Sequence, residues 1–139
     1  MTTAIDTNIL LDVLIPNEAF YDASAAALER ASAGLMVVCD IVYAELSVHF
    51  ESREECDDFL ESNQIRVEPL TRKAAFLASR AWRLYRSSGG KRSRILADFL
   101  IGAHAQEQAA RLLSRDRGFY RELFPSLTVV DPSTAQEHS

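Results

Sequence analysis

The sequence predicts a single α/β domain built on a parallel β-sheet of four to five strands, with helices on both faces. Short apolar runs of strand length alternate with longer stretches in which apolar residues recur at helical spacing. The run at 35–39 is apolar at every position, which is typical of a strand buried on both faces. Because strands that alternate with helices form a parallel sheet covered on both sides, this order indicates α/β architecture.

The first third of the chain is predicted to contain two strands and two helices. A strand at 3–6 leads into a short helix at 8–14, and a longer, alanine-rich helix follows at 18–33. Gly34 ends that helix, since glycine is common just beyond a helix C-terminus. The apolar run at 35–39 is the second strand.

The middle of the chain continues the alternation. Asp40 fits the N-cap of a helix at 40–50, and the sequence Ser-Arg-Glu-Glu opens a second helix at 52–62 in capping-box form. A third strand is expected at 65–68, and a long helix at 71–87.

The last third begins with a basic, glycine-containing stretch that favours a flexible loop. The predicted order is this loop at 87–94, a helix at 95–110, a strand at 111–114, a short helix at 119–123 and a final strand at 127–130. We expect one domain over residues 1–132 and a disordered C-terminal tail over 133–139.

Composition narrows the class of protein. At 139 residues the chain has the size of one domain, and its net charge of −5 argues against a protein that coats nucleic acid by bulk electrostatics. A nuclease whose acidic residues are neutralised by bound metal stays compatible with that charge. Acidic residues interrupt the N-terminal apolar stretch, so we expect no secretory signal, no membrane span and a cytoplasmic protein. Cys39 and Cys56 are then expected to be reduced thiols.

Four acidic residues occupy positions where a compact domain rarely places charge. Asp6 and Asp116 follow short apolar runs, whereas Glu45 and Asp98 interrupt the apolar stripes of predicted helices. Ligands of parallel sheets gather beyond the carboxyl ends of the strands. This topology brings Asp6, Asp116 and the helix that carries Glu45 to one edge.

Carboxylates brought together need compensation. Two of them near 4 Å repel by about 4 kcal/mol at an effective dielectric of 20. A hard divalent cation such as Mg²⁺ or Mn²⁺ removes this repulsion and prefers oxygen ligands. Such an ion acidifies a water and neutralises the charge that develops on a phosphate, so the pattern indicates phosphodiester hydrolysis. The sequence has no Gly-x-Ser-x-Gly elbow, no glycine-rich phosphate loop and no zinc-ligand spacing among its histidines.

Each carboxylate also has a structural interpretation. Asp116 could form an ion pair with Arg115 or Arg117, and Asp98 could form a buried ion pair with Arg94. Glu45 could be a solvated helix residue. Asp6 could cap a helix, a role that is compatible with metal binding. Asp12 is expected to be a solvated charge on a helix face.

Four segments carry a resemblance to a known family. They are Asp6-Thr7-Asn8-Ile9-Leu10, Tyr43-Ala44-Glu45-Leu46, the stretch Ala-Asp-Phe-Leu-Ile-Gly-Ala-His-Ala at 97–105, and Leu-Leu-Ser-Arg-Asp-Arg-Gly-Phe at 112–119. In this order and spacing the chain resembles the PIN-domain ribonucleases, specifically the VapC-type toxins of bacterial and archaeal toxin–antitoxin pairs. The similarity covers essentially the whole chain. Its departures are Ser114, where the family often carries Thr, and Gly102, where Ala is usual.

The resemblance implies a function and a set of roles. Asp6, Glu45, Asp98 and Asp116 would bind Mg²⁺ or Mn²⁺ for endonucleolytic cleavage of RNA, supported by Asn8 and Ser114. It also implies a cognate antitoxin and a homodimer. Lys91, Arg92 and Arg94 precede Asp98 and are candidates for contact with RNA phosphates, although loop cations are usually only solvated. Two alternatives stay open: a housekeeping PIN nuclease that processes RNA without an antitoxin, and an inactive interaction module that keeps the fold.

Overall fold

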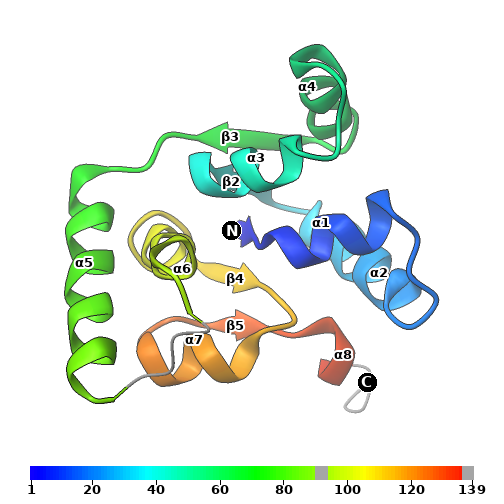
Figure 1. Cartoon of the computed structure of the whole chain (residues 1–139). Coiled ribbons are helices and arrows are strands. Elements are labelled where there is room, and N and C mark those ends of the chain that lie inside the picture. Colours follow the sequence, from blue (N-terminus) through cyan, green and yellow to red (C-terminus); the bar gives the residue numbers. More distant parts are fainter. Residues whose placement is uncertain (90–93, 136–139) are drawn as a thin grey trace.

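The computed structural model describes residues 1–89 and 94–135, and it contains a five-stranded, all-parallel sheet (Figure 1). The strands are β1 (Thr2–Ile5), β2 (Leu35–Cys39), β3 (Ile65–Glu68), β4 (Arg111–Leu113) and β5 (Val129–Val130). Their order across the sheet is β3-β2-β1-β4-β5, so β1 lies at the centre, paired with β2 and β4. The predicted fold class is confirmed.

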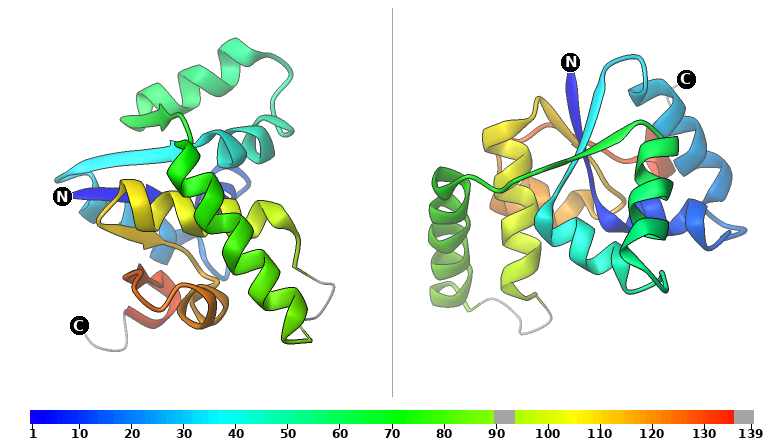
Figure 2. Two further views of the ribbon diagram at one scale, coloured as in Figure 1. Left: turned by 90° about the vertical axis from the view of Figure 1, so that its left-hand side faces the viewer. Right: turned by 90° about the horizontal axis from the view of Figure 1, so that it is seen from above.

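The helices form a layer on each face of the sheet. They are α1 (Thr7–Leu14), α2 (Tyr21–Ala31), α3 (Asp40–Ser47), α4 (Arg53–Ser62), α5 (Arg72–Ser87), α6 (Leu96–Gln108), α7 (Arg117–Leu123) and α8 (Pro132–Ala135). Seen from above, α1, α2 and α4 lie on one side of the sheet, and α5, α6 and α7 lie on the other (Figure 2). Helix α3 follows β2 and contacts both α1 and α6, so it joins the two layers at the carboxyl edge of the strands.

Side-chain caps explain where several helices begin. The Ser52 hydroxyl accepts from the Glu55 amide at 3.2 Å, and the Thr71 hydroxyl accepts from the Ala74 amide at 3.1 Å, as expected of N-caps. Asp40 does not cap α3: it is the first residue of that helix, and its carboxylate accepts from the Leu70 amide at 3.3 Å. Its role is to tie α3 to the chain that leaves β3.

Helix α2 begins later than its alanine-rich sequence predicts. The predicted start was residue 18, but the structure begins the helix at Tyr21. The Asn17 side chain accepts from the Ala19 amide at 2.9 Å, and the Asn17 carbonyl accepts from Tyr21. This turn uses the residues that would have formed the first helical turn.

Aromatic side chains fill the layer between the sheet and α5. Phe99 is fully buried on α6 and lies 5.3 Å from the rings of both Trp82 and Tyr85 on α5. On its other side Phe99 meets Phe119 at 5.2 Å and Phe124 at 6.4 Å, measured between ring centroids. This cluster fixes α6 against α5 and α7, and so sets the position of the acidic residue that precedes Phe99.

The described part of the chain ends in the short helix α8. Helix α8 continues past residue 132 to Ala135 and contacts α2, while residues 136–139 lie outside the described part of the chain. Cys39 and Cys56 are free and buried. No helix in the described ranges has the length and apolar character needed to cross a membrane.

Candidate active site

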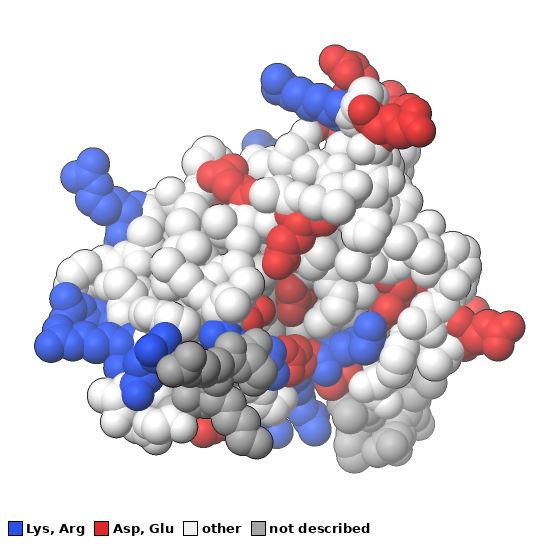
Figure 3. Space-filling view, in the orientation of Figure 1, with Lys and Arg blue, Asp and Glu red and all other residues white. Residues whose placement is uncertain are grey.

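The four carboxylates line one open pocket at the carboxyl edge of the sheet. Its volume is about 390 Å³, and it is lined by Asp6, Thr7, Asn8, Leu11, Glu45, His49, Asp98, Ile101, Asp116 and Tyr120. Figure 3 looks onto this edge and shows acidic atoms gathered in a hollow at the centre of the face. Topology therefore brings together residues that lie up to 110 positions apart in the sequence.

Asp6 is the most buried of the four, with 5% of its surface exposed. It follows β1 and caps α1: one carboxylate oxygen accepts from the Thr7 amide at 2.7 Å. The other oxygen accepts from the hydroxyls of Ser114 at 2.7 Å and Tyr120 at 3.1 Å. Burial, with a smaller contribution from the charge of Glu45, raises the pKa of Asp6 to about 6 against these hydrogen bonds. The hydrogen bonds to Asp6 therefore do not fully offset the cost of burying its charge.

Ser114 connects the ends of β1 and β4. Its hydroxyl donates to Asp6 and accepts from the Asp116 amide at 3.0 Å. The Asn8 side chain completes this frame, because its oxygen accepts from the Arg115 amide at 3.2 Å. Its amide nitrogen lies farther away, 3.4 Å from Asp6 and 3.5 Å from Ser114. Asn8 and Ser114 thus lie inside the acidic cluster and hold two of its members in place.

Glu45 enters the pocket from α3. Its carboxylate accepts from the Thr7 hydroxyl at 2.6 Å, and the side chain is partly buried. The alternative of a solvated helix residue is therefore wrong. Thr7 thus donates its hydroxyl to Glu45 and its amide to Asp6, which links the two carboxylates through one residue.

Asp98 lies in the first turn of α6. Its carboxylate accepts from the Ile95 amide at 3.1 Å, which stabilises the start of the helix. The ion pair with Arg94 that the sequence left open for Asp98 is not formed. Arg94 instead reaches Asp116, 22 residues away, with both of its terminal nitrogens.

The ion pairs around Asp116 also differ from those weighed on sequence grounds. The Arg94 guanidinium binds Asp116 and stacks on the Phe119 ring, 4.3 Å from its centroid. Arg115 turns away and makes a two-pronged ion pair with Asp12 at 2.7 and 2.9 Å. Asp12 is 3% exposed, so the expectation that it is solvated is wrong.

Of the three cations expected to contact RNA, only Arg94 belongs to the part of the chain that the structure describes. Lys91 and Arg92 lie outside the described residues. Arg94 lies within them, and its pairing with Asp116 raises its already high pKa, so it stays charged.

Two pocket residues with hydrogen bonds to the carboxylates were not singled out from the sequence. Thr7 was passed over within the Asp-Thr-Asn segment, and Tyr120 was not considered. The signal for Tyr120 was its place four residues after Asp116, because this spacing returns a side chain to the same helix face. Burial and the neighbouring carboxylates raise the pKa of Tyr120 well above its ordinary value, so it donates as a neutral phenol.

The side chains of the pocket can be compared with the ligands that a divalent cation prefers. The four acidic side chains in the pocket offer carboxylate oxygens, which fit a hard cation such as Mg²⁺ or Mn²⁺. Burial is the main cause of the raised pKa of Asp6, and the nearby Glu45 carboxylate adds to it. In the side-chain positions described, however, no three His, Cys, Asp or Glu residues gather closely enough to hold one ion. Instead, the Thr7 hydroxyl binds Glu45, Arg94 binds Asp116 and the Ile95 amide binds Asp98.

The chain matches a known protein family over most of its length. The model of the PIN domain family matches residues 3–122. No curated protein matches the chain.

Solved structures share the fold at low sequence identity. VapBC-1 from nontypeable Haemophilus influenzae superposes with a TM-score of 0.69 at 18% identity, covering 96% of this chain and 99% of that one. VapBC2 from Rickettsia felis, bound to a DNA fragment from its promoter, gives 0.66 at 21% identity, covering 94% and 98%. A toxin–antitoxin complex from Klebsiella pneumoniae gives 0.63 at 22% identity, covering 94% and 97%. Since the family match spans most of the sequence, the chain belongs to the PIN domain family.

Proposed function

We propose that this protein is a Mg²⁺-dependent endoribonuclease and the toxic component of a toxin–antitoxin pair. The observation that carries the proposal is the convergence of four carboxylates, from four separate segments, on one pocket at the carboxyl edge of the sheet. Membership of the PIN family supports a nuclease. The likeness to chains from VapBC and toxin–antitoxin complexes supports the toxin role.

Asp6, Glu45, Asp98 and Asp116 would hold the ion. Bound Mg²⁺ or Mn²⁺ would supply Lewis acidity and lower the pKa of a water that attacks the phosphodiester. To ligate the ion, Asp116 would have to give up its contact with Arg94.

The neighbouring residues would orient these carboxylates. Ser114 and Tyr120 donate to Asp6, so they hold its oxygens in fixed directions. Thr7 does the same for Glu45. Arg94 has the planar, charged head that suits a phosphate, and together with Lys91 and Arg92 it is proposed to contact the RNA backbone.

The proposed partners are an RNA substrate, a cognate antitoxin and a second copy of the chain. An antitoxin that presents an arginine to the pocket would meet negative charge there, as Arg94 does within the chain. A housekeeping PIN nuclease would use the same pocket without such a partner. A gene for a small DNA-binding protein directly upstream, whose product suppresses toxicity on co-expression, would favour the toxin.

One observation favours the inactive module. The ion pair between Arg94 and Asp116 neutralises one of the four carboxylates without any metal. If this pair were permanent, the pocket would have three available acids and the fold would serve as a binding platform. Activity measurements separate this possibility from the nuclease.

The test is cleavage of structured RNA by the purified protein with Mg²⁺ and with EDTA. We expect cleavage only with Mg²⁺, and a loss of at least about 100-fold in rate for Asp98→Asn, the scale seen when electrostatic stabilisation of a transition state is removed. Asp22→Asn is the matched control, because it removes one exposed negative charge on α2. Equal products in Mg²⁺ and EDTA would contradict a metal-dependent mechanism, and no cleavage under any divalent ion would favour the inactive module.

A further inference from the structure

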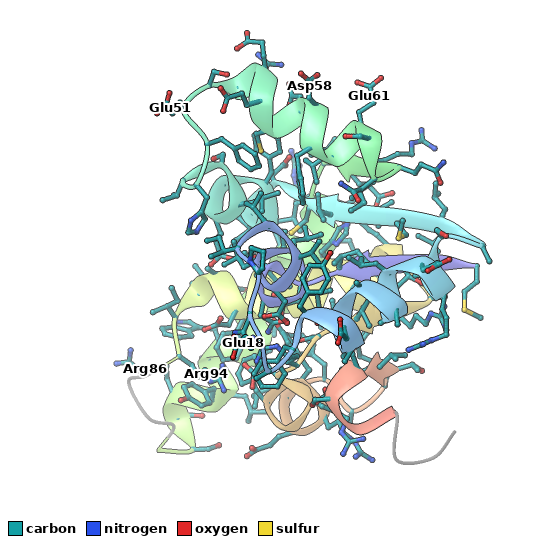
Figure 4. The ribbon with its side chains drawn as sticks, turned by 90° about the vertical axis from the view of Figure 1, so that its right-hand side faces the viewer. Glu18, Glu51, Asp58, Glu61, Arg86 and Arg94 are labelled. Atoms are coloured by element: carbon teal, nitrogen blue, oxygen red, sulfur yellow. The ribbon has the colours of Figure 1, made fainter. Side chains whose placement is uncertain are left out.

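Helix α5 concentrates positive charge on an acidic protein. Its 16 residues contain five cations and no acidic side chain, although the whole chain has a net charge of −5. These cations are Arg72, Lys73, Arg80, Arg83 and Arg86. Figure 3 shows basic side chains along the edge of the molecule formed by α5. In Figure 4, Arg86 lies at the end of the molecule opposite the acidic Glu51, Asp58 and Glu61 of the α4 region.

Within the part of the chain that the structure describes, one of these cations has a carboxylate partner. Lys73 pairs with Glu107 at 3.3 Å. In residues 1–89 and 94–135 no ion pair involves Arg80, Arg83 or Arg86. Their charge is therefore available to a partner, and it is not part of an intramolecular network.

Aromatic and apolar side chains lie among the cations on the exposed side of α5. Phe76 is 60% exposed and Leu84 is 63% exposed, whereas Ala74 and Ala78, on the opposite side of the helix, are fully buried. The Arg80 guanidinium stacks on the Phe76 ring at 4.6 Å. A surface of guanidinium groups beside an exposed aromatic ring fits a nucleic acid, because phosphates bind the cations and bases stack on the ring.

The C-terminal half of α5 packs against α6, the helix that carries Asp98. The Arg86 guanidinium lies 5.4 Å from the Trp82 ring, and Trp82 packs edge-on against Phe99, the residue after Asp98. Arg94 lies at the same end of the molecule as Arg86 (Figure 4) and binds Asp116 in the pocket. The helix is about 24 Å long, so a strand lying along α5 would span several phosphates before reaching the carboxylates.

We infer that the exposed face of α5, formed by Phe76, Arg80, Arg83 and Arg86, binds the backbone and bases of the RNA strand that the acidic pocket cleaves. This inference rests on the proposed ribonuclease function and assigns the substrate to a particular surface. A second copy of this chain fits the face less well, since twofold pairing of α5 with itself would oppose like charges.

The test measures RNA binding separately from cleavage. Fluorescence anisotropy of a fluorescein-labelled single-stranded RNA of mixed sequence, in EDTA, reports binding alone. The triple variant Arg80→Gln, Arg83→Gln and Arg86→Gln should bind at least about tenfold more weakly. The slope of log affinity against log salt should fall by about 2, since each phosphate contact on a single strand contributes about 0.7. Phe76→Ala should weaken binding at least about fivefold.

The matched control makes the same change in charge elsewhere. Arg30, Arg66 and Arg121 are exposed on α2, β3 and α7, and their triple substitution by glutamine should change affinity less than about twofold at moderate salt, where distant charges are screened. Equal losses in the two triple variants would show a bulk charge effect and overturn the inference, as would unchanged binding in the α5 variant. A change in molar mass by light scattering with unchanged RNA binding would assign the face to a protein interface and also overturn it.

Cleavage in Mg²⁺ distinguishes this inference from the proposed function. If the wild type cleaves RNA while the α5 variant binds it normally, the surface assignment fails and the ribonuclease stands. If the α5 variant loses binding while the wild type cleaves nothing with any divalent ion, the surface stands and the proposed activity fails. Circular dichroism of each variant confirms that it is folded before either result is used.

Discussion

Arg94 and Asp116 form a two-pronged ion pair at the edge of the acidic pocket, joining the residues just before α6 and α7. The guanidinium also stacks on Phe119, so its position is set by packing as well as by charge. A carboxylate paired in this way has less capacity to ligate a metal ion. Arg94 and a divalent cation would therefore compete for Asp116.

The first prediction follows from this competition. Arg94→Gln should raise the affinity of the pocket for Mn²⁺ about five- to tenfold, because a partly exposed ion pair contributes about 1 kcal/mol and 1.4 kcal/mol is a factor of ten. Isothermal titration of the protein with Mn²⁺, in the absence of RNA, measures the change. Arg117→Gln is the matched control, since it removes a positive charge beside Asp116 without breaking a contact found in the structure. Equal gains in affinity in both variants would show that the loss of a nearby positive charge, and not the broken contact with Asp116, causes the effect.

The second prediction concerns the buried charge of Asp6. Its folded-state pKa of about 6 lies above the ordinary value of 3.8 for an aspartate, so ionised Asp6 destabilises the folded protein. The penalty is absent below pH 3.8, grows as the pH rises, and is complete above about pH 6. Asp6→Asn should therefore gain stability relative to the wild type over this range, on the order of 2–3 kcal/mol in total. Urea unfolding in EDTA from pH 4 to pH 7.5 measures the difference.

The control for this experiment is Asp22→Asn, which removes an exposed carboxylate on α2. Its difference from the wild type should change with pH less than that of Asp6→Asn, because the side chain is exposed. If the stability difference between Asp6→Asn and the wild type is independent of pH, Ser114, Tyr120 and the Thr7 amide stabilise ionised Asp6 as fully as water does.

The sheet and the gathering of the carboxylates could be predicted from sequence because both depend on short-range patterns. The apolar run at 35–39 has the length of a buried strand, and Asp6 and Asp116 come at or just after the ends of such runs. Parallel topology then brings strand ends together without knowledge of any side-chain contact.

The ion pairs could not be predicted in the same way. Sequence reasoning weighed partners one to four residues apart, such as Arg94 with Asp98. The observed pairs join Arg94 to Asp116 and Arg115 to Asp12, which are 22 and 103 residues apart. Such pairs depend on how helices approach in three dimensions, and several partners of similar charge are equally compatible with the sequence.

The third prediction explains Gly102, where the resembling family usually has alanine. A Cβ atom at this position would lie 2.5 Å from the Phe124 ring, which is buried and bordered by Phe99 and Tyr120. Gly102→Ala gains about 1 kcal/mol in helix propensity but overpacks the core at a cost of about 1–3 kcal/mol. We expect a net loss of about 1 kcal/mol in the free energy of unfolding.

A double-mutant cycle with Phe124→Leu tests this explanation. The smaller side chain makes room for the added methyl group, so the double variant should be more stable than the sum of the two single changes predicts. Additive effects would show that Gly102 is required for another reason.

The fourth prediction concerns the buried ion pair that holds the loop after β4. Asp12 accepts two hydrogen bonds from Arg115 and one from the Ser24 hydroxyl at 2.8 Å, and the Arg115 guanidinium lies 3.9 Å from the Phe20 ring centroid. Removing one partner of such a pair costs about 3–5 kcal/mol when both are buried, and Arg115 is a quarter exposed. We therefore expect Asp12→Ala to lose about 2–4 kcal/mol in urea unfolding.

Asp12→Ala should also lower the affinity of the pocket for Mn²⁺, because Arg115 lies between Ser114 and Asp116. Its backbone amide donates to Asn8, so release of the side chain would loosen the frame that holds Asp6 and Asp116. Titration with Mn²⁺ at a temperature where Asp12→Ala is folded should show lower affinity than the wild type, while Asp22→Ala should not. A variant that loses stability but binds Mn²⁺ normally would limit Asp12 to a structural role. A loss of less than about 0.5 kcal/mol, within the range of ordinary surface substitutions, would mean that the ion pair contributes no net stability.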